Sequence, residues 1–468
     1  MVESARIGLS LSDCETALGI KARGGIAGLV FTGVSTDSRS TGKGELFVAL
    51  AGGAFDGHDF IPDAAARGAA GFVVADGKGV AVPKGTAVFS VDDTLFALGE
   101  LARFHRGRLR ARVVGITGSN GKTTTKEITA AVARTRYRTA KSEGNLNNLI
   151  GLPMTLLSAS PDTEVIILEM GMNVPGEIKR LSEIARPDIG VVTNIGPVHL
   201  EGVGSIEGVI REKGALAASL SEEGVLVLEG DTDYSRVLLS KTRARRLTFG
   251  LDAGSDVRAE GIEDLGGDGT RFRVVLPSGS FSARLRFPGV HNLKNALAAA
   301  AVGEALGVPP DSIGLGIESA TPMKMRMEIK KSEAGIVVLD DSYNANPVSM
   351  RAALEFLARE GKKNRGRLIA VLGDMLELGD YRLTGHEQVG AAAAASGIGY
   401  LFVLGDHADD VRRGAVGSRQ DERTVFTYPA GDHERLIGDL KEILRPGDVV
   451  LVKGSRGMRM EKIACALL

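Results

Sequence analysis

The sequence predicts an α/β protein with three domains, and three observations support this fold class. The chain has 468 residues, which is too long for one ordinary hydrophobic core, so about three domains are expected. Short apolar runs alternate with helical patterns through most of the chain, as in parallel sheets covered by helices on both faces. This strand–helix rhythm restarts after Thr321-Pro322, which indicates a second doubly wound domain beyond that point.

The three expected domains differ in size. A small α/β domain covers residues 1–109, with short strands such as Leu46–Leu50 and Gly71–Val74. A central domain with a mostly parallel sheet of the P-loop type, covered by helices on both faces, spans residues 110–320. A doubly wound, Rossmann-like domain follows over residues 321–468.

In the central domain, apolar runs predict buried strands over Val113–Thr117, Val165–Glu169, Ile189–Asn194 and Val225–Leu228, with helices such as Lys122–Ala133 and Ile206–Ser219 between them. Residues 256–287 differ, because Gly and Pro separate shorter runs there. These runs predict antiparallel strands over Val257–Ile262, Arg271–Leu276 and Phe281–Phe287. A helix is expected to follow from His291 to Leu306. The basic segment Arg103–Arg112 is interpreted as a solvated helix end rather than as a linker.

In the last domain, apolar runs predict strands over Ile336–Asp340, Leu368–Leu372, Tyr400–Leu404, Thr424–Tyr428 and Val449–Lys453. Pro347 is expected to open a helix, because its fixed φ suits the first helical position.

The composition excludes several classes of partner. Lys and Arg number 57 against 58 Asp and Glu, so the charge gives no case for a nucleic acid or a membrane surface. Cys14 and Cys465 lie at opposite ends of the chain, which argues against a disulfide framework or a zinc site. No signal peptide is apparent, and the apolar run Ala296–Gly303 is too short to cross a bilayer. These features favour a protein of the cytoplasm.

The most informative stretch is the glycine-containing segment that follows Val113-Val114. It predicts a buried strand, a turn and a helix whose N-terminus can hold phosphate oxygens. Lys122 can reach the terminal phosphates, and the Thr123 hydroxyl can hold Mg²⁺. The sequence therefore predicts that ATP or a similar nucleotide binds at Gly118, Ser119, Asn120, Gly121, Lys122, Thr123 and Thr124. The alternative is a glycine-rich turn with a solvated lysine.

Two candidate ligands follow strands of the central sheet. Glu169 ends one predicted strand, where a carboxylate can ligate Mg²⁺ or merely cap the strand. His199 follows the next strand, although magnesium prefers oxygen ligands and a lone His is more often structural. Lys213 lies on a predicted helix and, by composition, is one more surface lysine.

Two polar segments are candidates for ligand binding. The amides of Asn145, Asn147 and Asn148 suit either a loop that binds a polar ligand or ordinary turn chemistry. Residues 341–347 place a carboxylate, hydroxyls and amides after a strand, among them Asp341, Tyr343, Asn344 and Asn346. Arg326, just before this strand, can reach a phosphate.

Taken together, these motifs resemble the Mur ligase family in their order along the whole chain. The resemblance rests on the phosphate loop, Glu169, the Asn-Ile-Gly-Pro-Val-His segment at 194–199, the helix start at 291–296, Arg326 and the segment at 340–347. Residues 373–379, the segment at 144–148, and the segments around Ser38-Arg39 and Asp56–Phe60 point the same way.

The resemblance implies a role for each domain and for several residues. The first domain would bind a uridine nucleotide, through a segment that includes Ser38 and Arg39, and the centre would bind ATP. Glu169 and His199 are similar to magnesium ligands of the family, and Lys213 matches a lysine whose carbamate holds a second Mg²⁺. Asn295 would lie by the adenine, Asp341 by the ribose, Arg326 at the phosphates and Lys453 near the active site.

The implied activity is ATP-dependent ligation through an acyl phosphate in peptidoglycan precursor synthesis. Expected substrates are a UDP-N-acetylmuramoyl-tripeptide and D-alanyl-D-alanine, and a monomer is expected. One alternative is another amide ligase of the superfamily, either the Mur ligase that adds the third amino acid or a folylpolyglutamate synthetase. The other is a P-loop protein that binds nucleotides without ligation.

Overall fold

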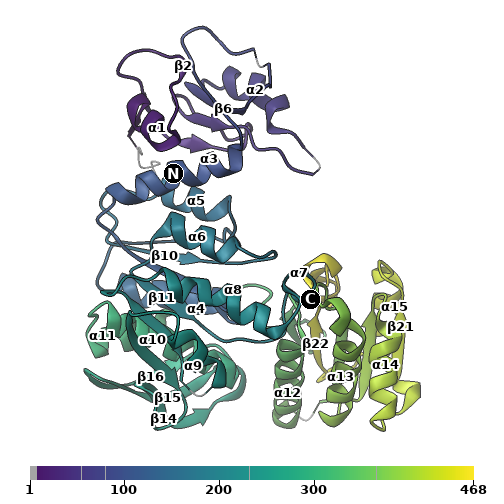
Figure 1. Ribbon diagram of the computed structural model, residues 1–468. Helices are drawn as coiled ribbons and strands as arrows, with labels where there is room; N and C mark the ends of the chain where they lie inside the picture. Colours follow the sequence, from purple (N-terminus) through teal and green to yellow (C-terminus); the bar gives the residue numbers. More distant parts are fainter. Residues whose placement is uncertain (1–7, 54, 80, 231, 365) are drawn as a thin grey trace.

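The computed structural model describes residues 8–53, 55–79, 81–230, 232–364 and 366–468. The chain forms three lobes, each built on its own parallel-rich sheet (Figure 1). The N-terminal lobe lies at the top of the view, the central lobe below it, and the C-terminal lobe beside the central one. The α/β fold class predicted from the sequence is therefore confirmed.

The N-terminal lobe contains a five-stranded sheet in the order β2-β7-β6-β5-β4, in which only β2 is antiparallel to its neighbour. Its strands are β2 (Arg23–Gly24), β4 (Val34–Ser35), β5 (Leu46–Val48), β6 (Gly71–Ala75) and β7 (Ala87–Val91). A small ladder pairs β1 (Leu9–Ser10) with β3 (Val30–Phe31). The helices are α1 (Leu11–Leu18), α2 (Ile61–Ala66) and α3 (Thr94–Arg108), with a 3₁₀ turn at Gly57–Phe60.

The central lobe contains a nine-stranded sheet in the order β16-β15-β14-β13-β12-β11-β8-β10-β9. Its strands are β8 (Arg112–Thr117), β9 (Thr139–Lys141), β10 (Val165–Glu169), β11 (Ile189–Val192), β12 (Val225–Glu229), β13 (Arg245–Gly250), β14 (Val257–Asp264), β15 (Thr270–Leu276) and β16 (Gly279–Leu285). The strands from β9 to β14 are parallel, and β14, β15 and β16 form the predicted antiparallel extension.

The helices of the central lobe are α4 (Lys122–Arg134), α5 (Gly151–Leu157), α6 (Glu177–Ala185), α7 (Leu200–Val203), α8 (Ile206–Ser219), α9 (Asp233–Leu239), α10 (Val290–Ala305) and α11 (Pro310–Ser319), with a 3₁₀ turn at Gly266–Asp268. All five residues of β10 are buried, as expected for a strand covered on both faces. The sequence missed β9 and β13. It also extended β11 to Asn194, but the strand ends earlier and Thr193 and Asn194 hold the neighbouring loop instead.

The C-terminal lobe contains a six-stranded sheet in the order β17-β18-β22-β19-β20-β21, and only β17 is antiparallel to its neighbour. The strands are β17 (Glu328–Lys331), β18 (Val337–Asp341), β19 (Leu368–Gly373), β20 (Tyr400–Leu404), β21 (Val425–Tyr428) and β22 (Val449–Lys453). The helices are α12 (Pro347–Asn364), α13 (Arg382–Ala395), α14 (Ala408–Gly417), α15 (His433–Ile443) and α16 (Glu461–Ala466), with 3₁₀ turns at Gly379–Tyr381, Glu422–Thr424 and Arg456–Met458.

The N-terminal and central lobes share one hydrophobic core. Buried side chains of the first sheet, such as Phe31 and Phe89, belong to the same cluster as Leu98 of α3 and Ile166 of β10. The end of α3 is consequently not simply solvated, which corrects the interpretation of Arg103–Arg112. The Arg106 side chain is 11% exposed and donates to the carbonyl of Ala185 at 2.9 Å.

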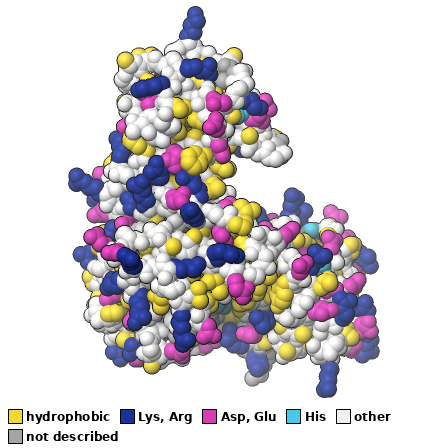
Figure 2. Space-filling model, in the orientation of Figure 1, with side chains coloured by type: hydrophobic (Ala, Val, Ile, Leu, Met, Phe, Trp, Pro, Cys, Tyr) yellow, Lys and Arg dark blue, Asp and Glu magenta, His cyan; other side chains and the backbone are white. Residues whose placement is uncertain are grey.

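The surface carries charges of both signs. On the face shown in Figure 2, Lys and Arg side chains are interspersed with Asp and Glu over all three lobes, and a deep notch separates the N-terminal from the C-terminal lobe. Within the described ranges, no helix has the length and apolar character needed to span a lipid bilayer.

Candidate active site

A cavity of about 640 Å³ lies between the central and C-terminal lobes. Both parallel sheets direct the carboxyl ends of their strands toward it, which is where open α/β sheets bind their ligands. The sequence-predicted residues that line it are Ser119, Asn120, Gly121, Lys122, Thr123, Thr124, Asn145, Asn147, Asn148, Glu169, His199, Asn295, Arg326, Asp341, Tyr343, Asn344, Asn346 and Lys453.

The predicted strand–turn–helix forms the floor of this cavity. Strand β8 ends at Thr117 and α4 begins at Lys122, whose ammonium donates to the carbonyl of Gly118 at 2.8 Å. The turn requires glycine at two positions. A Cβ on Gly118 would lie 1.9 Å from Thr193 Oγ1, and one on Gly121 would lie 2.2 Å from Asn295 Oδ1. The absence of these side chains lets the loop pack closely against its neighbours.

The loop is held in shape by the segment after β11. The Asn194 side chain accepts from the backbone N–H of Asn120 at 2.8 Å, and the Asn194 carbonyl accepts from Ser119 N–H at 3.0 Å. The Ser119 hydroxyl accepts from Gly196 N–H at 2.8 Å and donates to the Gly196 carbonyl at 3.0 Å. The loop geometry therefore exists before any ligand arrives.

Two positive side chains meet at this loop. Burial lowers the pKa of Lys122, and the nearby Arg326 lowers it further, while Glu169 opposes the shift. Arg326 donates to the Thr123 hydroxyl at 3.0 Å, and its guanidinium lies over the Tyr343 ring, 4.1 Å from the centroid. A polyphosphate at this position would compensate both charges.

Glu169, at the end of β10, is 2% exposed. Its Oε1 accepts from the Asn147 amide at 2.9 Å, whereas its buried Oε2 has no hydrogen-bond partner. The Asn148 side-chain amide serves its own loop, where it accepts from Gly151 N–H at 2.9 Å at the start of α5. At Asn145 the hydrogen bond within the loop is made by the backbone carbonyl, which accepts from Asn147 N–H at 2.7 Å.

His199 lies at the start of α7, on the side of the cavity that faces the C-terminal lobe. Its backbone is left-handed, with φ 53°, and its Nδ1 lies 2.6 Å from Oε2 of Glu377. The hydrogen bond from the imidazole holds the pKa of Glu377 below its usual range. Glu377 belongs to the loop after β19, so this pair joins the two lobes.

The C-terminal wall is built around Asp341, at the end of β18. Its carboxylate accepts from the Lys453 ammonium at 2.5 Å and from the backbone N–H of Met327 at 3.1 Å. The same ammonium donates to the Asn344 carbonyl at 2.9 Å. Asn346 reaches the central lobe, where its amide donates to the Asn120 side chain at 2.6 Å.

Four predicted residues are not among the described residues that line the cavity, namely Gly118 in the turn before α4, Ser38, Arg39 and Lys213. Ser38 and Arg39 lie in the N-terminal lobe, where Ser38 is buried and Arg39 is paired with Asp37 at 2.7 Å. Lys213 lies on α8 with 1% exposure, so the interpretation as a surface lysine is wrong. Burial, reinforced by the charge of Lys122, lowers the pKa of Lys213 well below the ordinary value.

Comparison with known proteins places this geometry in a family. Models described as "Mur ligase family, catalytic domain", "Mur ligase middle domain" and "Mur ligase, glutamate ligase domain" match residues 30–106, 116–303 and 325–456. The UDP-N-acetylmuramoyl-tripeptide–D-alanyl-D-alanine ligase of Bacillus subtilis is 38% identical over 439 residues, covering 94% of this chain and 93% of the relative. The chain belongs to the Mur ligase family.

Other members of the Mur ligase family agree. The Escherichia coli ligase of the same name is 37% identical, covering 98% of each chain. A crystal structure of MurF from Acinetobacter baumannii superposes with a TM-score of 0.88 at 30% identity, covering 98% of each chain. MurF from Thermotoga maritima in complex with ADP gives a TM-score of 0.78 at 29% identity, covering 93% of this chain and 96% of the other.

The magnesium that the Mur ligase resemblance implies has partial support in the side chains. Among the described residues, no group of three or more His, Cys, Asp or Glu side chains is arranged to hold a metal ion. Oε2 of Glu169 accepts no hydrogen bond and has only the Lys126 ammonium nearby, at 3.9 Å, so a cation in the cavity that Glu169 lines would give it a direct partner. Phosphate oxygens, water and the Thr123 hydroxyl would have to supply the other ligands.

Sequence reasoning missed several residues at this Mur ligase site. Lys126 is fully buried on α4, with its ammonium 3.9 Å from Glu169 and 3.2 Å from the Gly144 carbonyl. Glu229 ends β12 and pairs with Lys294 and with the Tyr234 hydroxyl, at 2.9 Å for the latter. The strand-end position of Glu229 was a usable signal. By contrast, Lys126 carries no sequence signal that distinguishes it from a surface charge, and Glu377 lies in the segment 373–379 that supported the resemblance, but no role was assigned to it there.

Proposed function

We propose that this chain is an ATP-dependent ligase that joins D-alanyl-D-alanine to a UDP-N-acetylmuramoyl-tripeptide in peptidoglycan precursor synthesis, with release of ADP and phosphate. The observation that carries the proposal is full-length similarity to ligases of that name, at 38% and 37% identity. It is supported by a phosphate loop, an arginine and a buried carboxylate that meet in one cavity.

The chemistry needs an activated carboxyl group, because an amine cannot displace oxide from a carboxylate. In the proposed reaction the γ-phosphoryl group moves from ATP to a carboxylate oxygen, giving an acyl phosphate and ADP. The dipeptide amine then attacks the carbonyl carbon, phosphate leaves, and the nitrogen loses a proton. Lys122 and Arg326 are positioned to stabilise charge on the phosphates, and the cavity between two lobes can exclude water.

We assign the metal side of the site to Thr123, Glu169 and His199, with Lys213 below it. Mg²⁺, when bound, supplies charge neutralisation on the phosphates. Burial lowers the pKa of Lys213 and so favours its neutral amine, which is the form that reacts with CO₂ to give a carbamate. A second Mg²⁺ held by that carbamate is part of this proposal.

The remaining assignments follow the order of the lobes. Residues 1–109 would bind the uridine nucleotide, with Ser38 and Arg39 in that site. Residues 110–320 would bind ATP, with Gly118–Thr124 at the phosphates and Asn295 at the adenine. Residues 321–468 would complete the ATP site through Arg326 and Asp341. The peptide substrates are assigned to Asn145, Asn147, Asn148, Tyr343, Asn344, Asn346 and Lys453.

We further propose that the enzyme acts as a monomer in the cytoplasm, where ATP is available. The donor peptide can carry either diaminopimelate or lysine at its third position, and both are included in the test below.

The proposal is tested by measuring ADP and product formation with ATP, each UDP-linked tripeptide and D-alanyl-D-alanine. ADP formation is expected to require both peptide substrates, and the dipeptide is expected to have a much higher kcat/KM than single D-alanine. Efficient use of a single amino acid would instead favour the Mur ligase that adds the third residue. Hydrolysis of ATP without either peptide would favour a nucleotide-binding protein that does not ligate.

A further inference from the structure

Two backbone positions of unusual conformation meet where the C-terminal lobe contacts the central lobe. His199 has φ 53° and Glu377 has φ 63°, a left-handed conformation that residues other than Gly adopt only rarely. Their side chains pair at 2.6 Å, and both line the cavity. Such backbone strain persists only where the surrounding structure enforces it, and it often occurs at functional sites.

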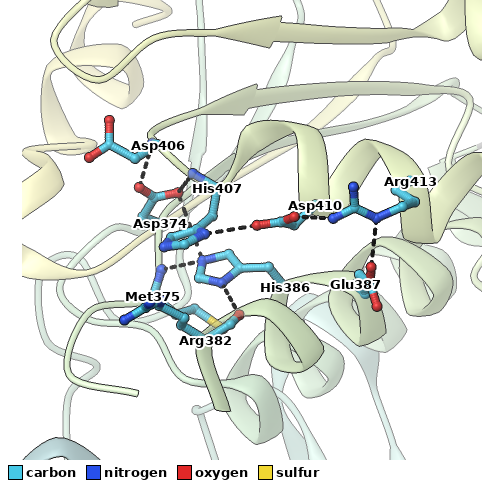
Figure 3. A network of polar contacts seen from close by, with 9 residues as sticks. All are labelled: Asp374, Met375, Arg382, His386, Glu387, Asp406, His407, Asp410 and Arg413. Atoms are coloured by element: carbon cyan, nitrogen blue, oxygen red, sulfur yellow. Dashed lines mark hydrogen bonds and ion pairs between the residues drawn. The ribbon is translucent and has the colours of Figure 1, made fainter. Parts of the chain in front are cut away.

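On the C-terminal side, a polar network fixes the loop that carries Glu377 (Figure 3). Nε2 of His386 accepts from the backbone N–H of Met375 at 3.0 Å, and its Nδ1 lies 2.6 Å from the Arg382 carbonyl. Both ring nitrogens are therefore occupied by the backbone. The Asp374 carboxylate accepts from the backbone N–H groups of Asp406 at 2.7 Å and His407 at 3.2 Å.

The fixation continues to the residue before Glu377. The backbone N–H of Leu376 donates to the Ser455 hydroxyl at 2.9 Å, and Ser455 N–H donates to the Asp374 carbonyl at 3.0 Å. The rings of His386 and His407 stack with centroids 4.6 Å apart, which adds packing beneath the loop. Glu377 is thus presented to the central lobe from a fixed base.

On the central side, the backbone around α7 receives this loop. Glu201 N–H donates to the Glu377 carbonyl at 3.5 Å. Gly379, at φ 54°, approaches so closely that a Cβ there would lie 3.2 Å from Glu201 Cα. The Glu377 carboxylate therefore meets His199 as part of a shaped contact, unlike a pair of freely moving surface side chains.

We propose that Glu377 is a positioning residue for the ligase reaction, which accepts a hydrogen bond from Nδ1–H of His199 and so leaves Nε2 of that imidazole available to the cavity. A carboxylate can only accept, so Nδ1 must carry the hydrogen, and in the neutral imidazole Nε2 then keeps its lone pair. A carboxylate on the outer nitrogen of a ligating histidine fixes the tautomer and ring orientation in this way. The inference rests on the proposed function, because His199 acts there as a ligand.

The arrangement also makes the tautomer depend on contact between the lobes. The acceptor comes from the C-terminal lobe and the imidazole from the central lobe. Separation of the lobes would leave Nδ1 without this carboxylate, and the His199 ring would be free to turn. The ring orientation and tautomer of His199 would therefore be fixed less firmly in the central lobe alone than in the assembled cavity.

The test compares Glu377→Ala with Glu377→Gln in the full chain. The Gln amide oxygen can still accept from Nδ1–H, whereas Ala cannot. We expect Glu377→Ala to lower kcat about 10- to 100-fold, with KM for ATP within about threefold of wild type, and Glu377→Gln to recover most of the loss. The matched control is Asp421→Ala, which removes an exposed carboxylate paired with Arg423 at 2.8 Å on the same lobe, and it is expected to leave activity unchanged.

A second measurement does not depend on turnover. Nitrogen-15 spectra of histidine-labelled, ligand-free protein at one pH report the tautomer of each ring, and His199 is assigned by its loss in His199→Asn. We expect an Nδ1–H tautomer for His199 in wild type and Glu377→Gln, and a mixture in Glu377→Ala. An unchanged tautomer, or full kcat in Glu377→Ala, or an equal loss in both variants, overturns the proposal. If wild type itself forms no product, the proposed function fails, and the spectra still decide the role of Glu377.

Discussion

The two walls of the cavity are held in different ways. The central wall, at the phosphate loop, is fixed by its own lobe: Asn194 and Ser119 supply hydrogen bonds to the backbone, and glycines allow the close approach. The C-terminal wall contacts the central one through a few groups, such as the side chains of Asn346 on Asn120 and Glu377 on His199, and the Glu377 carbonyl on Glu201 N–H. The central wall is therefore preorganised, whereas the C-terminal wall completes the site only when the lobes meet.

This difference suggests a division of work. A preformed loop can bind the nucleotide with little rearrangement, because its N–H groups are already directed. The opposite wall, which reaches the loop by Arg326 and Asn346, can close after both substrates are bound and exclude water from the acyl phosphate. Variants of the central wall should therefore abolish chemistry, and variants of the C-terminal contacts should weaken it.

The largest effect is expected for Lys122→Ala, which removes the ammonium from the preformed wall. We expect kcat to fall at least about 10²- to 10³-fold, because the charge stabilises the transferred phosphoryl group. Circular dichroism and the melting temperature should stay close to wild type. Turnover within a few-fold of wild type would show that the loop assignment is wrong.

A nearly equal loss is expected for Lys213→Ala, beneath the same wall. The variant should be almost inactive and partly rescued by small carboxylates, which replace the oxygens of a carbamate. Product formation is measured with and without acetate or formate. An active variant without any additive would make Lys213 structural only and remove it from the metal site.

The same lysine gives a prediction for stability. Its folded pKa is lowered below that of the unfolded chain, so the unfolded state binds the extra proton and the burial cost is largest at low pH. In CO₂-free buffer near pH 7, we expect the free energy of unfolding of Lys213→Met to exceed that of wild type by about 1–3 kcal/mol, so the variant is the more stable protein. This advantage should shrink as pH rises toward the pKa of a free lysine. Denaturant titrations at several pH values measure it, and an advantage that grows with pH would contradict the burial argument.

A smaller effect is expected for Arg326→Ala, since Arg326 reaches the loop from the segment between the lobes. We expect kcat/KM for ATP to fall about 10- to 100-fold, because one charge-assisted contact to phosphate and the packing on Tyr343 are lost. Arg326→Lys should recover only part of it, because an ammonium lacks the planar stacking surface. If Arg326→Lys recovered the full kcat/KM for ATP, the positive charge alone would account for the contribution of Arg326.

The smallest effect is expected for Asn346→Ala at the contact between the walls. Loss of the hydrogen bond to Asn120 should lower kcat about 3- to 10-fold, and KM for ATP should change little. A loss as large as that of Lys122→Ala would mean that the two walls do not differ as argued here.

The elements predicted from the sequence were those with strong local signals. Strand β10 and helix α8 match the predicted ranges, because an unbroken apolar run and a long helical period need no partner to be recognised. Strand β17 was missed, since its charged edge residues, Glu328 to Lys331, become a strand only by pairing with β18. The position of Lys213 was likewise invisible, because its burial depends on how α8 packs against distant segments.

The candidate site divides in the same way. Lys122, Glu169 and Arg326 occur in motifs whose spacing or strand-end position marks them, and all three line the cavity. Glu377 meets His199 from 178 positions away along the chain, and no local pattern records such a pairing. Contacts between lobes depend on tertiary structure, so a single sequence allows them to be predicted only where it resembles a family of known structure.

The core shared by the N-terminal and central lobes has a mechanical consequence. Side chains from Leu9 to Leu216 form one buried cluster across α3, whereas the C-terminal sheet is packed in its own clusters. The first two lobes should consequently melt as one cooperative block, and calorimetry should resolve the C-terminal lobe as a second transition. Among the described residues, the joint between these blocks then lies near residues 320–326, and the span between the proposed uridine-binding segment and the phosphate loop is set when the chain folds.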